Sequence, residues 1–270
     1  MPELPEVELV ARYLRPRLVG RCIQAVETTA QSYFFLTSPS VLRRRLPGET
    51  IHALDRHGKY LLLELSSHCR LLLHLGMTGQ LMIAGKKQPR LAREQRRATR
   101  DAAAPRGTSR SGKDHTALAD ATSIPFERDA HTHLVLEFAD GGAALYFRDA
   151  RKFGKVRLLE PGTSDPRLDK LGPDALKVTA ELLFDASRKR RIEVKSLLLD
   201  QSVLAGVGNI YADESLYLAG IHPTRSAVAL TREDCANLAK VVRRVLRYSI
   251  SHGGSSIDDY VHPDGSSGEF

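Results

Sequence analysis

The hydrophobic pattern of this chain changes near its middle, and that change constrains the fold more than any other feature. Short runs rich in β-branched and aromatic residues, separated by turn signals, fill residues 22–159, with the clearest at 51–65, 71–84, 134–138 and 143–148. Helical spacing replaces them after 161–166, at 181–188, 192–200, 210–219 and from residue 231 onward. Many short strands followed by helices predict a two-domain α+β protein whose first domain is a sandwich or a barrel.

Both ends of this pattern carry strong helix signals. Residues 3–18 place apolar side chains close to helical spacing, and Gly20 follows as a helix stop. Near the other end, Thr231 and Asp234 form a capping box ahead of an apolar stripe. We therefore predict an N-terminal helix attached to the β domain and a long helix late in the second domain.

These signals give a domain layout. We predict a β domain at 1–160, a linker at 161–173 and a helical domain at 174–252. Residues 86–130 interrupt the first domain with almost no bulky apolar side chains, which predicts a disordered insertion. The formal net charge is +8, and residues 86–113 alone, with ten Lys/Arg and two Asp/Glu, carry all of it. Because the rest of the chain is formally neutral, the net charge favours no function for the folded body.

Other features exclude several classes of protein. No run of 18 or more apolar residues is present, so we expect no membrane-spanning segment. The acidic start lacks the apolar core of a secretory signal, which favours a cytoplasmic protein. Cys22, Cys69 and Cys235 are widely spaced and set in apolar patterns. We interpret them as reduced core cysteines, without the C-x-x-C pairs that hold zinc.

The first residues, Met1-Pro2-Glu3-Leu4-Pro5-Glu6, offer an unusual nucleophile. If Met1 is removed, Pro2 presents a secondary amine, and α-amines have reference pKa values of about 7.7–8.0. Such an amine can attack an electrophilic carbon, as a Schiff-base lysine does. The alternative interpretation is that Pro2 merely opens a helix, and the N-terminus by itself does not decide between them.

Four further stretches occur in order: His57-Gly58-Lys59-Tyr60, His74–Gly79, Asp149–Gly154 and Gly206–Glu214. Together with the N-terminus, they resemble the bacterial formamidopyrimidine-DNA glycosylases of base-excision repair. The resemblance covers nearly the whole chain outside 86–130. It implies an N-terminal helix with a β-sandwich, a helical domain with a helix–two-turns–helix element, and a monomer that acts on damaged double-stranded DNA.

The resemblance also implies an activity and its catalytic residues. Members excise oxidised purines such as 8-oxoguanine and formamidopyrimidines, then cut the strand by β,δ-elimination through an imine. Pro2 matches the residue that attacks C1′, and Glu3 matches the acid that protonates the sugar oxygen. Such an acid needs a raised pKa. Glu6 matches a supporting carboxylate, although an acid in a first helical turn has an equally good structural explanation. Lys59 matches an active-site phosphate contact.

The remaining matched residues would contact DNA or support the fold. Met77, Arg151 and Phe153 match side chains that fill the space left by an extruded base, an extrusion that costs a few kcal/mol. His131, Lys195 and Asn209 match phosphate contacts. Arg151 matches a cation that contacts the base left without its partner. Glu214 matches a structural acid. The glycine-containing turn before residue 209 suits phosphate capture at a helix N-terminus.

The sequence departs from the family pattern in two parts. The first is the basic insertion, which we expect to tether the protein to DNA without specificity because residues 86–113 hold the entire charge excess. The second is the last part of the chain. Residues 253–270 resemble the lead-in to a four-cysteine zinc finger, but no ligand set follows in the sequence given, so we expect no metal or other cofactor. Two alternatives stay open. One is an endonuclease VIII-like enzyme for oxidised pyrimidines, and the other is a catalytically inactive DNA-binding relative.

Overall fold

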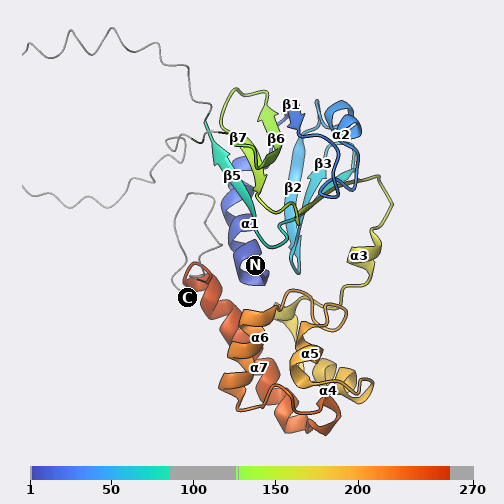
Figure 1. Ribbon diagram of the computed structural model, residues 1–270, viewed down its shortest axis with the longest axis vertical. Helices are drawn as coiled ribbons and strands as arrows, with labels where there is room; N and C mark the ends of the chain where they lie inside the picture. Colours follow the sequence, from blue (N-terminus) through green and yellow to red (C-terminus); the bar gives the residue numbers. More distant parts are fainter. Residues whose placement is uncertain (1, 86–125, 127, 256–270) are drawn as a thin grey trace, which may run out of the picture.

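The computed structural model describes residues 2–85, 126 and 128–255. Most of the predicted basic insertion, together with Met1 and residues 256–270, lies outside the described residues. Within them the chain forms an upper, strand-rich domain and a lower, helical domain (Figure 1). None of the described helices is long and apolar enough to cross a membrane.

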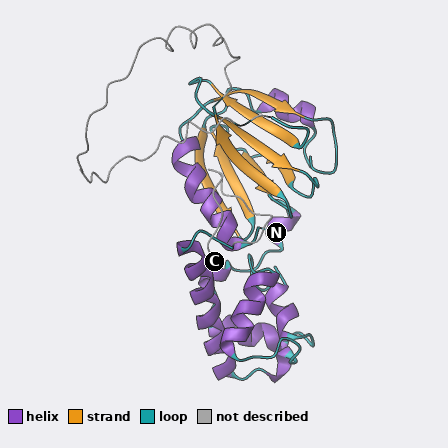
Figure 2. Ribbon diagram, turned by 60° about the vertical axis from the view of Figure 1, so that its left-hand side comes forward, coloured by secondary structure: helices purple, strands orange, loops and turns teal. Residues whose placement is uncertain are grey.

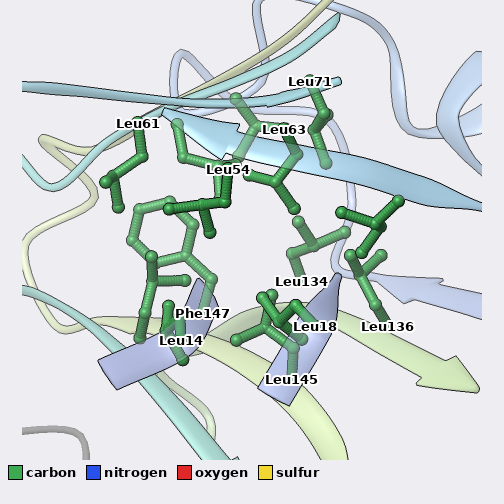
Figure 3. Close-up of a cluster of buried hydrophobic side chains, with 14 of the residues drawn as sticks. Leu14, Leu18, Leu54, Leu61, Leu63, Leu71, Leu134, Leu136, Leu145 and Phe147 are labelled. Atoms are coloured by element: carbon green, nitrogen blue, oxygen red, sulfur yellow. The ribbon is translucent and has the colours of Figure 1, made fainter. Parts of the chain in front are cut away.

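The first domain is a sandwich of two antiparallel four-stranded sheets. One sheet has the order β1-β6-β7-β5 and the other β2-β3-β4-β8. The strand bounds are β1 Ile23–Thr28, β2 Ile51–His57, β3 Tyr60–Leu65, β4 Arg70–His74, β5 Gly79–Ala84, β6 Thr132–Phe138, β7 Ala144–Asp149 and β8 Lys155–Leu159. Figure 3 shows leucines from both sheets interdigitating with Phe147, which lies fully buried between them. The sequence pattern left a sandwich or a barrel open, and the structure is a sandwich.

Helix α1 (Leu4–Leu18) connects the cores of the two domains. Its residues Val7, Val10, Leu14 and Leu18 are buried in the core of the sandwich. Leu4, one turn earlier, is fully buried in the core of the helical domain instead. The helix therefore fixes the chain start at the junction of the domains, as Figure 2 shows.

The second domain packs helices around one apolar core. Its helices are α3 Pro166–Asp169, α4 Ala180–Arg188, α5 Val194–Leu199, α6 Asn209–Ala219 and α7 Arg232–Ser251, with short 3₁₀ turns at Ala175–Lys177 and Ala227–Ala229. Thr231 and Asp234 form the predicted capping box of α7. The end of α6 turns at Gly220, whose φ of 67° suits glycine.

The structure confirms the predicted fold class and adds elements that the sequence pattern did not resolve. The run at 51–65 is two strands, because Gly58 turns the chain at φ 54°. The run at 71–84 is likewise split, at Gly76. Helix α2 (Pro39–Arg45) was not predicted inside the β domain, and the predicted linker contains the short helix α3.

Candidate active site

The start of α1 lies against the turn that precedes α6. The backbone N–H of Leu4 donates to the carbonyl of Gly206 at 3.1 Å. One oxygen of the Glu3 carboxylate accepts from the N–H of Gly208 at 2.6 Å, and the other accepts from Ile210 at 3.0 Å. A Cβ on Gly208 would lie 2.3 Å from the carboxyl carbon of Glu3. Glycine is therefore required there by the close approach of this carboxylate.

Glu6 is buried one turn further along α1 and connects the chain start to two other helices. Its carboxylate accepts hydrogen bonds from the N–H of Glu3 at 2.9 Å, from the N–H of Ser255 at 2.9 Å and from the hydroxyl of Tyr211. The Tyr211 hydroxyl is also 2.6 Å from that of Ser249 on α7. Glu6 thus positions the first residues of the chain. This position is compatible with a supporting role, and the bonds to Tyr211 and Ser255 go beyond what an acid in a first helical turn contributes.

Lys59 enters the same region from the turn between β2 and β3. The turn is packed tightly against the helical domain, since a Cβ on Gly58 would lie 3.0 Å from the Cβ of Ala205. Lys59 is 9 % exposed, and burial lowers the pKa of its amine while the charges of Glu3 and Glu6 oppose that change. The amine therefore lies within electrostatic reach of both carboxylates.

The environment of Glu3 suits a proton donor. Its side chain is 2 % exposed, and Pro2 beside it is buried as well. Burial raises the pKa of Glu3, whereas the positive charge of Lys59 and the bonds from Ile210 and Gly208 limit the rise. Once Met1 is removed, a carboxyl with a raised pKa next to Pro2 can donate a proton to a group that the proline amine attacks. The fold thus brings together Pro2, Glu3, Glu6 and Lys59.

A second cluster forms where two loops of the sandwich meet. Asp149 is fully buried and accepts from the hydroxyl of Thr78 at 2.6 Å, the N–H of Gly154 at 2.6 Å and the N–H of Arg151 at 3.2 Å. The loops touch through their backbones, because a Cβ on Gly76 would lie 2.5 Å from the carbonyl carbon of Phe153. The carboxylate of Asp149 therefore fastens the loop at 75–78 to the loop at 150–154.

The tips of these loops carry the residues matched to base replacement. Met77 and Phe153 are each 39 % exposed, and Arg151 is exposed beside them. The Arg151 guanidinium carbon lies 4.7 Å from the centroid of the Phe153 ring. These three side chains occupy one exposed surface, although methionine and phenylalanine more often lie in a core.

The four other matched residues have exposed or partly exposed side chains, and two of them adjoin the clusters. The N–H of Asp149 donates to the carbonyl of His131 at 2.8 Å. Asn209 lies between Gly208 and Ile210, whose N–H groups bind Glu3. His131 is exposed just before β6, and Asn209 is exposed at the first position of α6. Lys195 on α5 forms an ion pair with Asp213 at 2.8 Å. Glu214 is exposed on α6 and lines a pocket with Leu218, Arg244, Val245 and Tyr248. The structure therefore does not bring Glu214 into contact with the Glu3 cluster.

Sequence reasoning missed a buried charge network between the domains. Arg56 on β2 is 7 % exposed and binds Glu8 of α1 at 2.6 Å and Asp174 of the helical domain at 2.6 Å. It also donates to the carbonyl of Gly58, at the turn that carries Lys59. Asp174 follows a Gly-Pro pair in the predicted linker, and no local pattern could pair it with residues more than 100 positions away.

Sequence reasoning also missed three residues that support the site: Tyr211, Asp149 and His74. His74 is buried beside Tyr60, with ring centroids 4.7 Å apart, and burial together with nearby cations lowers its pKa to about 4. The neutral ring then accepts the N–H of Gly76 at 3.2 Å on Nδ1, which orients the loop that carries Met77. All three missed residues lie inside the quoted motifs, so the motifs were the available signal.

The described part of the chain offers no ligand set for zinc. Among residues 2–85, 126 and 128–255, no three His, Cys, Asp or Glu side chains gather as a metal site would require. Cys69 and Cys235 are buried in separate domains, and Cys22 precedes β1. These three cysteines do not fit a zinc finger.

The fold and the site define a class of protein: a two-domain protein whose buried chain start is held between a β-sandwich and a helix–two-turns–helix domain. Two family models match the chain. The formamidopyrimidine-DNA glycosylase N-terminal domain matches residues 1–156, and the H2TH domain of the same enzymes matches residues 171–261. The chain belongs to the formamidopyrimidine-DNA glycosylase family.

Individual relatives agree with this assignment. A formamidopyrimidine-DNA glycosylase of Paracoccus denitrificans is 40 % identical over all of this chain and 85 % of its own length. One from Polynucleobacter necessarius is 37 % identical over all of this chain and 86 % of its own length. The crystal structure of the MutM (Fpg) protein of Thermus thermophilus matches with a TM-score of 0.76 and 31 % identity, covering 99 % of this chain and 84 % of that one.

Proposed function

We propose that this protein excises oxidised purines from double-stranded DNA and then cuts the strand by β,δ-elimination through an imine on Pro2. The observation that carries the proposal is the Glu3 carboxyl, which is buried beside Pro2, has a raised pKa and lies near the Lys59 amine. A protonated acid next to a secondary amine is the pair that this reaction needs.

The residues act in a simple order. With Met1 removed, the unprotonated Pro2 nitrogen attacks C1′ of the damaged nucleotide, the bond from C1′ to the base breaks, and the base leaves with the proton that the nitrogen gives up. Glu3 gives its proton to the sugar ring oxygen, so the ring opens and the bond from Pro2 to C1′ becomes an imine. Loss of a proton from C2′ expels the 3′ phosphate, and a second elimination expels the 5′ phosphate. Lys59 holds a neighbouring phosphate, and the mechanism needs no cofactor.

Solved relatives support the choice of substrate. MutM has been solved in complex with DNA that contains carbocyclic 8-oxo-G, with a TM-score of 0.76 and 31 % identity, covering 98 % of this chain and 84 % of that one. A Lactococcus lactis Fpg has been solved with DNA that contains an abasic site. The bond network that positions Pro2 and Glu3 in this chain favours an active enzyme over an inactive DNA-binding relative. We further infer that the protein works as a monomer.

Borohydride trapping tests the mechanism. The full chain, with Met1 removal verified by mass spectrometry, is incubated with an 8-oxoguanine duplex and borohydride. We expect a covalent protein–DNA adduct that Pro2→Gly weakens severely. Pro5→Gly, which changes a nearby proline in the first turn of α1 but leaves the Pro2 amine, is the matched control. No adduct with the processed chain would refute the proposal.

A parallel series with a thymine-glycol duplex decides the substrate class. Faster excision of 8-oxoguanine supports the purine proposal. Faster excision of thymine glycol overturns the purine preference in favour of the endonuclease VIII-like alternative while keeping the imine chemistry.

A further inference from the structure

The loop that carries Arg151 and Phe153 is held at almost every backbone position. From inside the sandwich, the Asp149 carboxylate accepts the N–H groups of Arg151 and Gly154. From outside, the Lys155 amine donates to the carbonyls of Phe153 at 3.0 Å and Gly154 at 3.1 Å. A loop with both its donors and its acceptors occupied is preorganised for contact with a partner.

Tyr33 supplies the remaining support, from a segment far away in the sequence. Its hydroxyl donates to the carbonyl of Arg151 at 2.7 Å. The next residue, Lys152, has φ 58°, a conformation that a non-glycine residue adopts at a cost in energy. The bond to the carbonyl that precedes Lys152 therefore stabilises the strained backbone through which Arg151 and Phe153 are presented.

Tyr33 is also exposed on the same surface as the side chains that it supports. Its side chain is 56 % exposed, and its ring centroid lies 6.4 Å from that of Phe153. The Lys155 amine lies 4.6 Å from the Tyr33 ring, and the Arg151 guanidinium covers Phe153 at 4.7 Å. The four side chains thus form a row in the order cation, aromatic, aromatic, cation: Arg151, Phe153, Tyr33 and Lys155.

Such a row has the chemistry of a site for an unpaired nucleotide. Aromatic faces stack on bases of any sequence, and flanking cations neutralise phosphates. An exposed tyrosine that served only as a structural brace would not need two aromatic rings and two cations on one surface.

We propose that Tyr33 is a further DNA-contacting residue, which positions the loop 150–154 through the Arg151 carbonyl and extends the stacking surface of Phe153 for the nucleotide opposite the lesion. This inference rests on the proposed function. Its test therefore includes a substrate that needs imine chemistry but no base opposite the lesion.

The test compares Tyr33→Phe, Tyr33→Ala and the wild type on two substrates. The first is an 8-oxoguanine duplex, scored by single-turnover excision. The second is a single-stranded oligonucleotide with an abasic site, scored by borohydride trapping. Tyr248→Phe and Tyr248→Ala are the matched controls, since Tyr248 is 54 % exposed on α7.

We expect Tyr33→Phe, which removes only the hydrogen bond, to slow duplex excision about threefold, and Tyr33→Ala to slow it about tenfold or more. Trapping on the single strand stays at the wild-type level for both. Thermal melting of every variant checks the fold. The double variant Tyr33→Ala/Phe153→Ala should be less impaired than the product of the two single effects, because both residues serve one surface.

Each outcome has a clear meaning. Duplex rates equal to the wild type for both Tyr33 variants would overturn the inference, as would equal losses on the duplex and the single strand. Failure of the wild type itself on both substrates would refute the proposed function instead.

Discussion

The Glu3 carboxylate and the backbone N–H of Gly208 meet at 2.6 Å although they lie 205 positions apart in the chain. This bond joins the chain start to the turn before α6, so the acid that the proposed reaction needs is positioned by the opposite domain. Ile210 contributes a second N–H to the same carboxylate. Movement between the domains is therefore coupled directly to the geometry of Glu3.

Gly208→Ala tests this coupling. Gly208 has φ −127°, so alanine is allowed by the backbone, but its Cβ would lie 2.3 Å from the carboxyl carbon of Glu3. We expect displacement of the carboxylate and a loss of base excision of at least about 100-fold, the scale of losing a general acid. Gly142→Ala is the control, because its Cβ would meet only the ends of two side chains, Arg21 at 3.0 Å and Asp140 at 3.2 Å. Single-turnover excision measures both, and an unimpaired Gly208→Ala enzyme would contradict the assignment.

Lys59→Met tests the electrostatics of the site. Burial raises the pKa of Glu3, and the charge of Lys59 is the largest influence that opposes the rise. Without Lys59 the pKa of Glu3 rises further, so Glu3 keeps its proton to higher pH. We expect excision to fall on the order of 100-fold, while the decline of the residual rate on the alkaline side moves to higher pH. The pH–rate profile of the residual activity provides the measurement, and a shift toward lower pH would exclude this account.

The sequence predicted those parts of the protein that depend on local patterns. The helix at the chain start, the capping box of Thr231 and the change from strands to helices are all encoded within a few residues. The motifs also identified Glu3 and Lys59. The Arg56–Asp174 ion pair and the bond from Tyr33 to Arg151 could not be predicted, because each joins segments more than 100 positions apart. Packing of the two domains against each other brings the first pair together, and packing within the sandwich brings the second together. Such pairs have no periodic signal.

Asp149→Ala tests the attachment between the two exposed loops. The substitution leaves the Thr78 hydroxyl and the N–H groups of Arg151 and Gly154 without their shared acceptor. We expect the free energy of unfolding to fall by about 3 kcal/mol, since hydrogen bonds to a charged group contribute about 1.5–3 kcal/mol each and some donors would reach water. Urea denaturation measures the loss. Asp149→Asn keeps the size and an acceptor and should lose less, so equal losses for the two variants would count against this explanation.

Glu8→Gln tests the network between the domains through its pH dependence. Burial opposes ionisation of Glu8, but the hydrogen bonds from Arg56 and Arg12 outweigh it and hold the pKa below its ordinary value. Because the pKa of Glu8 is lower in the folded protein, its ionised carboxylate stabilises the fold fully at pH values above the ordinary pKa of 4.5. This stabilisation is lost as the pH falls through the pKa that Glu8 has in the folded protein. We expect Glu8→Gln to be less stable than the wild type at neutral pH and to lose less stability on acidification. Urea midpoints at neutral and acidic pH decide, with the exposed Glu233→Gln as control, and parallel pH curves for wild type and Glu8→Gln would reject the idea.

Deleting residues 86–113 tests whether the basic insertion tethers the protein to DNA. The segment carries ten Lys/Arg and two Asp/Glu, and the rest of the chain is formally neutral. Each phosphate that a cation neutralises releases counterions, so the logarithm of the binding constant falls with the logarithm of salt by about 0.9 per contact. If several of these cations contact phosphates, the deletion makes the salt dependence of binding to undamaged duplex less steep. Borohydride trapping of an abasic single strand persists, because Pro2, Glu3, Glu6 and Lys59 are intact. Deletion of residues 114–125, which contain no Lys or Arg, is the matched control and should keep the wild-type slope. An unchanged slope after removal of 86–113 would leave DNA binding to the folded domains alone.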